Sequence, residues 1–324
     1  MQPKQILYFY DDNKRGKTEP RTWVFGFLVL FFALIIAPYL VYGMFNFITR
    51  RLVFAGYLDN YTLTHFLGVL LDWLPSVVIY GLGIWFVQKH LRKRPLMKII
   101  TSAPRFRWKR LFAGALVFLF LTIVFLFVEA LFSGGSSGIF STETSRKLLS
   151  FDYRYHGHSL EFWMGLPIVL LFSPLNSAFQ ELVFRGFGDQ GLTRYIPKKS
   201  FAFLVSAVVF ALYHYGNPEM YYGPIPYLLL MVIFGFAMSV ITSMDGGLEA
   251  AIGIHVANNL FYFLIIGGNG SGWVQTWLFS YELGPVTYKI VLLDLVFFFL
   301  CTYLLSIWRF GRGVEKPAKR AKPI

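Results

Sequence analysis

Three short groups of residues bring polar side chains into stretches of chain that are otherwise almost entirely apolar. In chain order they are Gln180, Glu181 and Arg185; Phe210 and His214; and His255 and Asn259. Ionisable side chains are costly in a lipid bilayer, so they usually face the protein interior and mark a functional site. Carboxylates and imidazoles can transfer protons, and amides can stabilise negative charge. We therefore expect these residues to form a catalytic cluster.

The spacing within each group places its residues on one face of a helix. Glu181 and Arg185 are four residues apart, so their side chains can meet as an ion pair. His255 and Asn259 have the same spacing, which lets the amide fix the imidazole tautomer. Taken singly, the groups have plainer interpretations: an anchoring ion pair, a structural histidine, and an Asn–His contact between two helices. Three such groups in neighbouring apolar segments favour one shared site.

The elements that carry these residues are predicted to be transmembrane helices. Of the 324 residues, 56% are hydrophobic and 15% are charged, and the apolar residues form continuous runs rather than the alternation of a transmembrane barrel. We therefore expect an all-α, polytopic membrane protein with about eight transmembrane helices. The expected spans are 23–48, 62–87, 111–132, 161–184, 200–214, 223–243, 247–266 and 287–308.

The length of the fourth helix decides whether Glu181 can meet His214. If this helix continues to about Arg194, the carboxylate lies as deep as the imidazole at the end of the fifth span. If the helix ends at Arg185, the carboxylate lies near the membrane surface. Glycines follow Arg185 closely, so the sequence leaves both possibilities open.

The formal net charge of +13 is distributed as in a membrane protein, so we expect no nucleic-acid partner. With eight spans, the four most basic regions fall on one side of the membrane: residues 1–22, 89–110, 194–199 and 309–324. The opposite loops at 215–222 and 267–286 carry no Lys or Arg. Basic loops mark the cytoplasmic side, so we expect both termini in the cytoplasm and the protein in the plasma (inner) membrane.

One membrane domain, residues 23–308, is expected between two basic cytoplasmic tails, residues 1–22 and 309–324. Cys301 is the single cysteine, which excludes an intramolecular disulfide and a cysteine-based zinc site. A His-Glu-x-x-His zinc motif is also missing from the sequence. We therefore expect no metal and no cofactor.

The three groups together resemble the motifs of the CAAX-protease and bacteriocin-processing (CPBP) family of intramembrane proteases, which includes the type-2 CAAX prenyl endopeptidases. The family pattern is Glu-Glu-x-x-x-Arg, Phe-x-x-x-His and His-x-x-x-Asn/Asp on successive membrane helices. The corresponding residues here are Gln180, Glu181, Arg185, Phe210, His214, His255 and Asn259. The resemblance covers about residues 160–265.

The resemblance implies a polar cavity between the fourth, fifth and seventh helices, and peptide hydrolysis by an activated water. It implies that the first glutamate and a histidine activate the water without a metal. The second histidine, His255, and Asn259 would support the oxyanion. Arg185 and Phe210 would support the site structurally, and Glu181 would do so through Arg185.

The chain departs from the family pattern at the residue that usually acts as the base. Gln180 replaces the first glutamate, and an amide cannot take a proton from water. Glu181 could act as the base, a histidine could act as a slower base, or the protein could bind peptides without cutting them. Such a non-catalytic relative could be natural or an engineered inactive variant.

We expect an intramembrane endopeptidase that cleaves a membrane-anchored peptide or protein tail within the lipid bilayer. The alternatives are a non-catalytic binding or immunity protein of the same fold, favoured by Gln180, and a transporter that uses the same polar cluster. The sequence leaves the substrate and the oligomeric state open.

Overall fold

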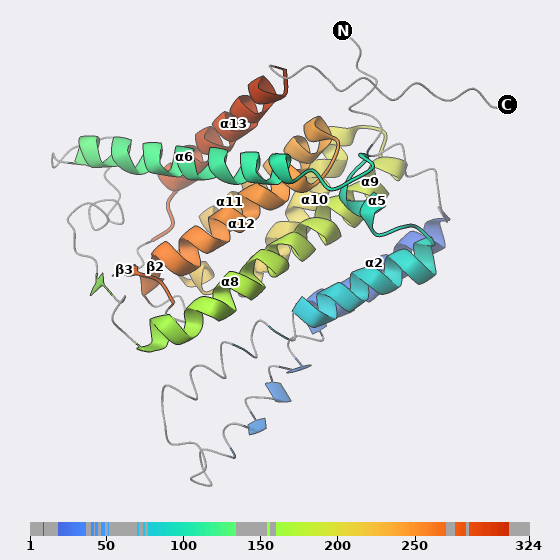
Figure 1. The fold of residues 1–324 in the computed structure, drawn as a ribbon, viewed down its shortest axis with the longest axis horizontal. Coiled ribbons are helices and arrows are strands. Elements are labelled where there is room, and N and C mark those ends of the chain that lie inside the picture. Colours follow the sequence, from blue (N-terminus) through green and yellow to red (C-terminus); the bar gives the residue numbers. More distant parts are fainter. Residues whose placement is uncertain are drawn as a thin grey trace.

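The protein is a bundle of long helices (Figure 1). The computed structural model describes residues 19–36, 77–133, 160–269, 276–282 and 285–310, with residues 154–155 and some isolated positions between residues 9 and 74. Most of the two expected tails, and large parts of the expected spans 23–48 and 62–87, lie outside the described residues.

The helices before the site-bearing region lie along one side of the bundle and across its top. In chain order they are α2 (Pro20–Phe31) with η3 (Phe32–Ile36), a helix from residue 77 that continues into η4 (Val87–Arg92), α5 (Met97–Ile100) and α6 (Trp108–Ser133). In Figure 1, α2 lies beside the helix that ends in η4, while α6 crosses over the middle of the molecule.

The later helices form the body of the bundle. They are α8 (Leu160–Glu181), η5 (Leu182–Asp189), α9 (Gln190–Tyr195), α10 (Lys199–Tyr213), η6 (His214–Gly216), η7 (Pro218–Tyr222), α11 (Pro224–Asp245), α12 (Glu249–Leu260), η8 (Phe261–Ile265) and α13 (Tyr288–Phe310). A small sheet joins β1 (Arg154–Tyr155), β3 (Phe279–Glu282) and β2 (Ile266–Asn269) in that order. The β1–β3 pair is antiparallel and the β2–β3 pair is parallel.

The expected all-α, polytopic class is confirmed. Within the described residues, five helical segments are long and apolar enough to cross a membrane: Trp108–Val128, Phe162–Tyr195, Lys199–Gly216, Pro224–Asp245 and Tyr288–Ile307. Two shorter apolar helices are Pro20–Phe31 and Glu249–Ile265. The count of eight spans therefore stays a prediction. The expected end of the fourth span at residue 184 was wrong, because that helix continues to Tyr195.

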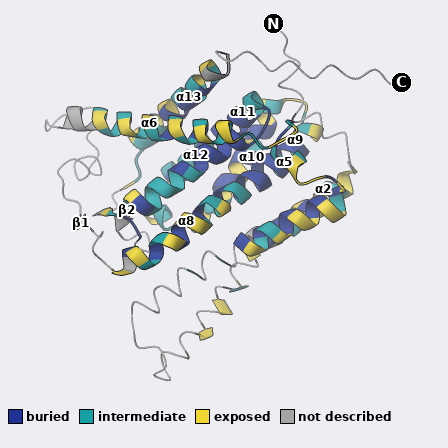
Figure 2. Cartoon of the chain, in the orientation of Figure 1, coloured by how far each residue is buried: buried dark blue, intermediate teal, exposed yellow. Residues whose placement is uncertain are grey.

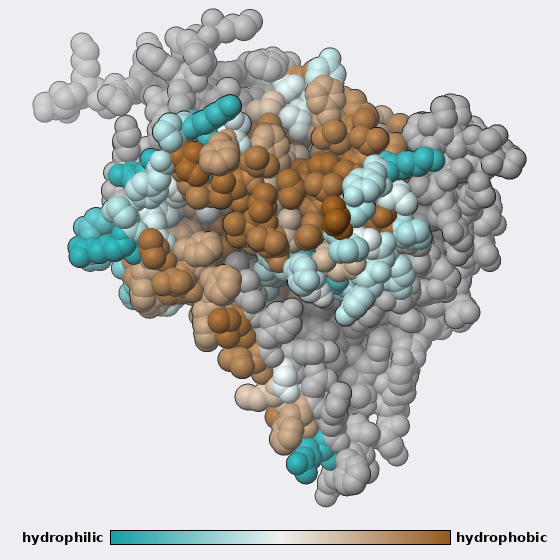
Figure 3. Space-filling model, turned by 180° about the vertical axis from the view of Figure 1, so that it is seen from behind, coloured by the Kyte–Doolittle hydropathy of each residue, from teal (hydrophilic) through white to brown (hydrophobic). Residues whose placement is uncertain are grey.

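The outer faces of the bundle are apolar, as contact with lipid requires. Along α6, exposed side chains recur every three or four residues and form one hydrophobic stripe, at Phe112, Leu116, Phe120, Ile123 and Phe127. Figure 3 shows a broad apolar surface on the far side of the molecule from the view of Figure 1. Large apolar surfaces of this kind on long apolar helices fit an integral membrane protein, in which lipid covers them.

Helix α12 is largely buried and lies in the middle of the bundle (Figure 2). Every residue from Glu249 to His255 is buried. Small residues permit this close packing: a Cβ added to Gly253 would lie 1.9 Å from the carbonyl oxygen of Leu111, and one added to Gly114 would lie 2.1 Å from that of Ala250. The backbones of α6 and α12 therefore touch, and α12 is held at a fixed depth beside α8.

Candidate active site

Glu181 lies deep in the bundle because its helix does not stop at the glycines that follow it. The chain passes from α8 directly into the π-helical turns of η5 and then into α9, so one continuous helical segment runs from Phe162 to Tyr195. At about 1.5 Å per residue, Glu181 is about 20 Å from the Tyr195 end, and His214 is about 22 Å along α10 from Lys199. The two residues therefore reach similar depths.

The centre of the site is a buried carboxylate shared by a histidine and an arginine. The Oε1 atom of Glu181 lies 2.7 Å from Nδ1 of His255, and Arg185 donates to the same oxygen from Nη1 at 3.2 Å. Arg185 also donates from Nη2 to the carbonyl oxygen of Gly235 at 3.0 Å. Glu181 and Arg185 are completely buried and His255 is 3% exposed. The arginine thus ties η5 to α11 while it neutralises the carboxylate.

Phe210 holds both histidines in place. Its ring centroid is 4.4 Å from that of His214 and 6.2 Å from that of His255. The guanidinium carbon of Arg185 lies over the same ring at 4.4 Å. The second and third motifs therefore meet on one phenylalanine, which both histidines contact.

In each of the two imidazoles, Nδ1 has a hydrogen-bond partner, so Nε2 is the ring nitrogen that could contact water or substrate. Nδ1 of His214 lies 2.8 Å from the carbonyl oxygen of Phe210. A carbonyl oxygen can only accept, so Nδ1 carries the proton and Nε2 can take one. In His255 the same atom, Nδ1, contacts the Glu181 carboxylate. A carboxylate oxygen can only accept, so Nδ1 of His255 carries a proton and its Nε2 is the nitrogen left for the substrate.

Asn259 lies one helical turn beyond His255 and contacts α8. Its Nδ2 donates to Oγ of Ser177 at 2.9 Å, and Asn258 donates to its Oδ1 at 3.2 Å. The hydroxyl of Ser177 in turn donates to the carbonyl oxygen of Ser173 at 2.9 Å. Ser177 was missed in the sequence analysis. Its position one turn before Glu181, on the same helix face, is the signal that could have revealed it.

Gln180 is buried at 5% exposure. Its Oε1 atom, like Oε2 of Glu181, has no hydrogen-bond partner among the residues that the structure describes. A buried acceptor without a partner costs about 1–3 kcal/mol, so it is commonly met by water or ligand. Each of these oxygens could accept a hydrogen bond from a water or a peptide N–H group.

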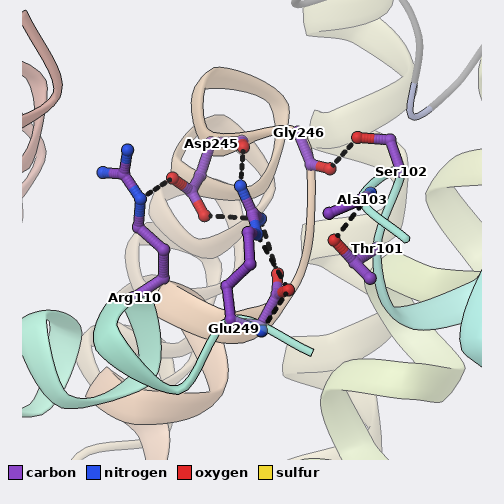
Figure 4. Close-up of polar contacts among 8 residues, drawn as sticks. Thr101, Ser102, Ala103, Arg110, Asp245, Gly246 and Glu249 are labelled. Carbon is purple, nitrogen blue, oxygen red and sulfur yellow. Dashed lines mark hydrogen bonds and ion pairs between the residues drawn. The ribbon is translucent and has the colours of Figure 1, made fainter. Parts of the chain in front are cut away.

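A second polar cluster, absent from the sequence predictions, fixes the position of α12 (Figure 4). Arg107 precedes α6 and binds the completely buried Glu249, with Nε 2.9 Å from Oε1 and Nη2 2.6 Å from Oε2. It also binds Asp245 at the end of α11, with Nη2 2.8 Å from Oδ2. Arg110 contacts the other oxygen of Asp245 at 3.4 Å.

Arg107 stays charged in this cluster. Burial lowers the pKa of its guanidinium, but the hydrogen bond and charge of Glu249 and the charge of Asp245 together raise it above its usual value. Because folding raises the pKa of Arg107, the charged guanidinium contributes to the stability of the folded protein. This contribution is lost only when the pH rises through the folded-state pKa of Arg107, far above neutrality. Because Glu249 is the first residue of α12, the cluster sets the depth of His255 further along that helix.

Among the described residues, no three His, Cys, Asp or Glu side chains are grouped so that they could hold a metal ion. The observed contacts of the imidazoles and the amide permit proton transfer by an imidazole, together with charge stabilisation by a carboxylate-bound imidazole and an amide.

The fold and the buried cluster define a class, the polytopic helical membrane proteins with a polar site between their helices. Residues 161–261 match the family model described as type II CAAX prenyl endopeptidase Rce1-like, so the resemblance expected from the three motifs is confirmed. The matched segment contains all seven motif residues.

One curated relative is the uncharacterized protein YyaK of Bacillus subtilis (strain 168). The two chains are 28% identical over 200 residues, a stretch that covers 61% of this chain and 62% of the relative. No solved structure matches the chain.

Proposed function

We propose that this protein is an intramembrane endopeptidase of the CAAX-protease type that cleaves a membrane-anchored peptide or protein tail. The observation that carries the proposal is the 2.7 Å contact between Glu181 and His255, beside His214, in the interior of a membrane protein. The match of residues 161–261 to the Rce1-like family supports this class of reaction. The substrate reaches the site within the bilayer, because the helices that carry the site span it.

In this proposal His214 acts as a slower general base in place of the carboxylate that Gln180 replaces. Its Nδ1 proton is held by the carbonyl oxygen of Phe210, which leaves Nε2 to take a proton from water. A neutral base positioned in this way is suited to water activation. Glu181 is less suited, because one of its oxygens already binds both Arg185 and His255.

His255 and Asn259 are proposed to stabilise the oxyanion that forms when water attacks the peptide carbonyl. The Glu181 carboxylate holds the imidazole of His255 through Nδ1, so its Nε2 can be turned towards the developing charge and donate to it whenever that nitrogen carries a proton. Asn259 uses one N–H group on Ser177 and retains another for the substrate. Preorganised donors of this kind are typically worth about two to three orders of magnitude in rate.

The chain as written is proposed to be slow, because Gln180 stands where the family has a carboxylate. Loss of a general base typically costs about 10²–10⁴-fold in rate. We expect Gln180→Glu to raise cleavage at least about tenfold on a fluorogenic membrane-anchored peptide in proteoliposomes. The added activity should vanish in the Gln180→Glu, His214→Ala double variant and persist in the presence of a chelator.

A matched control is Gln88→Glu, which alters another buried glutamine, 3% exposed, away from the site. It should leave the rate at its original value. Strong cleavage by the chain as written, lost in Glu181→Gln and unchanged in Gln180→Glu, would instead make Glu181 the base.

The second candidate function is a non-catalytic peptide-binding or immunity protein of the same fold. Oε1 of Gln180, which is buried and has no hydrogen-bond partner in the described part of the chain, favours this function, because an amide oxygen can accept from a peptide N–H group without reacting. Tight binding of a membrane-anchored peptide by both forms, with no cleavage by either, would support this function and overturn the endopeptidase.

A further inference from the structure

A large apolar groove lies between α10, α11 and α13 and belongs to neither polar cluster. Its volume is about 1050 Å³. Its walls include Leu204 from α10, Val232, Phe236 and Val240 from α11, and Leu295 and Phe299 from α13. The α11 residues recur every four positions, so they form one helix face.

The groove is separated from the candidate active site by two aromatic rings. Phe298 lines the groove and its ring lies 5.3 Å from that of Phe234. On its other side, Phe234 lies 4.9 Å from the imidazole of His255. A molecule in the groove would therefore contact the back of this aromatic wall and not the site itself.

Polar residues line the groove only near one end. Lys198 and Ser200 lie at the start of α10, and Thr302 lies in the second half of α13. Lys198 is exposed and forms no salt bridge with any residue that the structure describes. The groove thus has a positive mouth at the basic end of the bundle.

From this mouth the groove continues into the apolar part of the bundle. Val240 and Val232 are eight residues apart on α11, which corresponds to about 12 Å along the helix axis. The open side is strongly hydrophobic: Phe299 is 67% exposed and Leu295 is 52% exposed. A cation above a long apolar channel matches the layout of a phospholipid, with its phosphate above its acyl chains.

We propose that this groove binds one anionic phospholipid, with an acyl chain between α10, α11 and α13 and the phosphate against Lys198. Lipid hydrocarbon surrounds these helices, so the acyl chain can enter the groove without displacing water from polar groups. Lys198 adds selectivity for anionic headgroups, since basic residues at a membrane surface attract them. This proposal does not depend on the endopeptidase activity.

The test measures lipid retained by the purified full chain from detergent micelles containing equal amounts of phosphatidylglycerol and phosphatidylcholine. Native mass spectrometry counts the bound molecules. We expect one tightly retained phosphatidylglycerol. Lys198→Gln should lower the preference for it about fivefold, the effect expected for one basic residue near an anionic lipid. Lys199→Gln, a change at the next residue and away from the groove, should leave the preference unchanged.

A second pair of variants tests the acyl-chain part of the groove. Val240→Trp fills the groove and should abolish retention, whereas Phe112→Trp on the exposed face of α6 should not. If Val240→Trp fails to fold, Leu204→Trp, at a 42% exposed position on the same groove, replaces it. Equal retention of the two lipids by the original chain, or full retention in the folded Trp variant, would overturn the proposal.

Discussion

At the scale of single residues, the site depends on one buried cation. Arg185 lies between the Glu181 carboxylate, the carbonyl oxygen of Gly235 and the ring of Phe210. In the interior of a membrane protein, a carboxylate without its cation is strongly destabilising. The same cation binds the carboxylate oxygen that contacts His255. The structural and the proposed catalytic roles of the first motif therefore cannot be separated.

Arg185→Ala should destabilise the protein by about 3–5 kcal/mol, because it leaves the buried Glu181 carboxylate without its guanidinium partner. Arg185→Lys should recover only part of the loss, since an ammonium group cannot reach both Glu181 and Gly235 with the same geometry. Thermal unfolding in detergent measures both. Arg105→Ala removes an exposed arginine and is the control. Melting of Arg185→Ala at the original temperature would show that the pair is not energetically important.

At the scale of elements, the position of α12 relative to α6 decides where His255 lies. Two contacts fix it: the backbone approach at Gly114 and Gly253, and the ion pair between Arg107 and Glu249 at the start of the helix. Neither contact involves a residue of the candidate active site. A change in either is expected to move His255 away from Glu181 without altering a site residue.

Gly253→Ala should destabilise the protein by about 1–3 kcal/mol or more, because the new Cβ overlaps the backbone of α6. The nearest atom, the carbonyl oxygen of Leu111, is 1.9 Å from the Cβ position and cannot move without its helix. Gly43→Ala is the matched control, since nothing lies within 4 Å of its Cβ position. An unchanged unfolding temperature in Gly253→Ala would contradict the close approach of the two helices.

At the scale of the whole molecule, the charges gather at one end of the helices. The start of α6, the end of α9, the start of α10 and the end of α11 all lie at this end, and they carry the basic regions 89–110 and 194–199. The Arg107 cluster joins three of the helices there. We expect this end to face the cytoplasm, because basic segments are retained on that side of the membrane.

Cysteine labelling tests this orientation in a Cys301→Ala background. Arg105→Cys lies at the basic end and should not react with an impermeant thiol reagent in intact cells. Tyr221→Cys, at a 90% exposed position near the opposite end, should react. Both should react after permeabilisation, which confirms that both thiols are accessible. The reverse pattern would invert the topology.

The sequence by itself determined the class of protein and the identity of most of the candidate site. Long apolar runs can be stable only as membrane helices, because backbone polar groups must be satisfied within each segment. Polar residues are so costly in these runs that Glu181, Arg185, His214, His255 and Asn259 could be recognised from composition and spacing alone.

Only the tertiary structure decided how these residues meet. The continuation of α8 through η5 gave Glu181 its depth, because helical turns can pass through glycines when neighbouring helices pack against them. The contacts of Ser177 with Asn259 and of Arg107 with Glu249 join residues 82 and 142 positions apart. Local spacing carries no information about such pairs. They follow from the packing of whole helices, which is set by contacts such as those at Gly114 and Gly253.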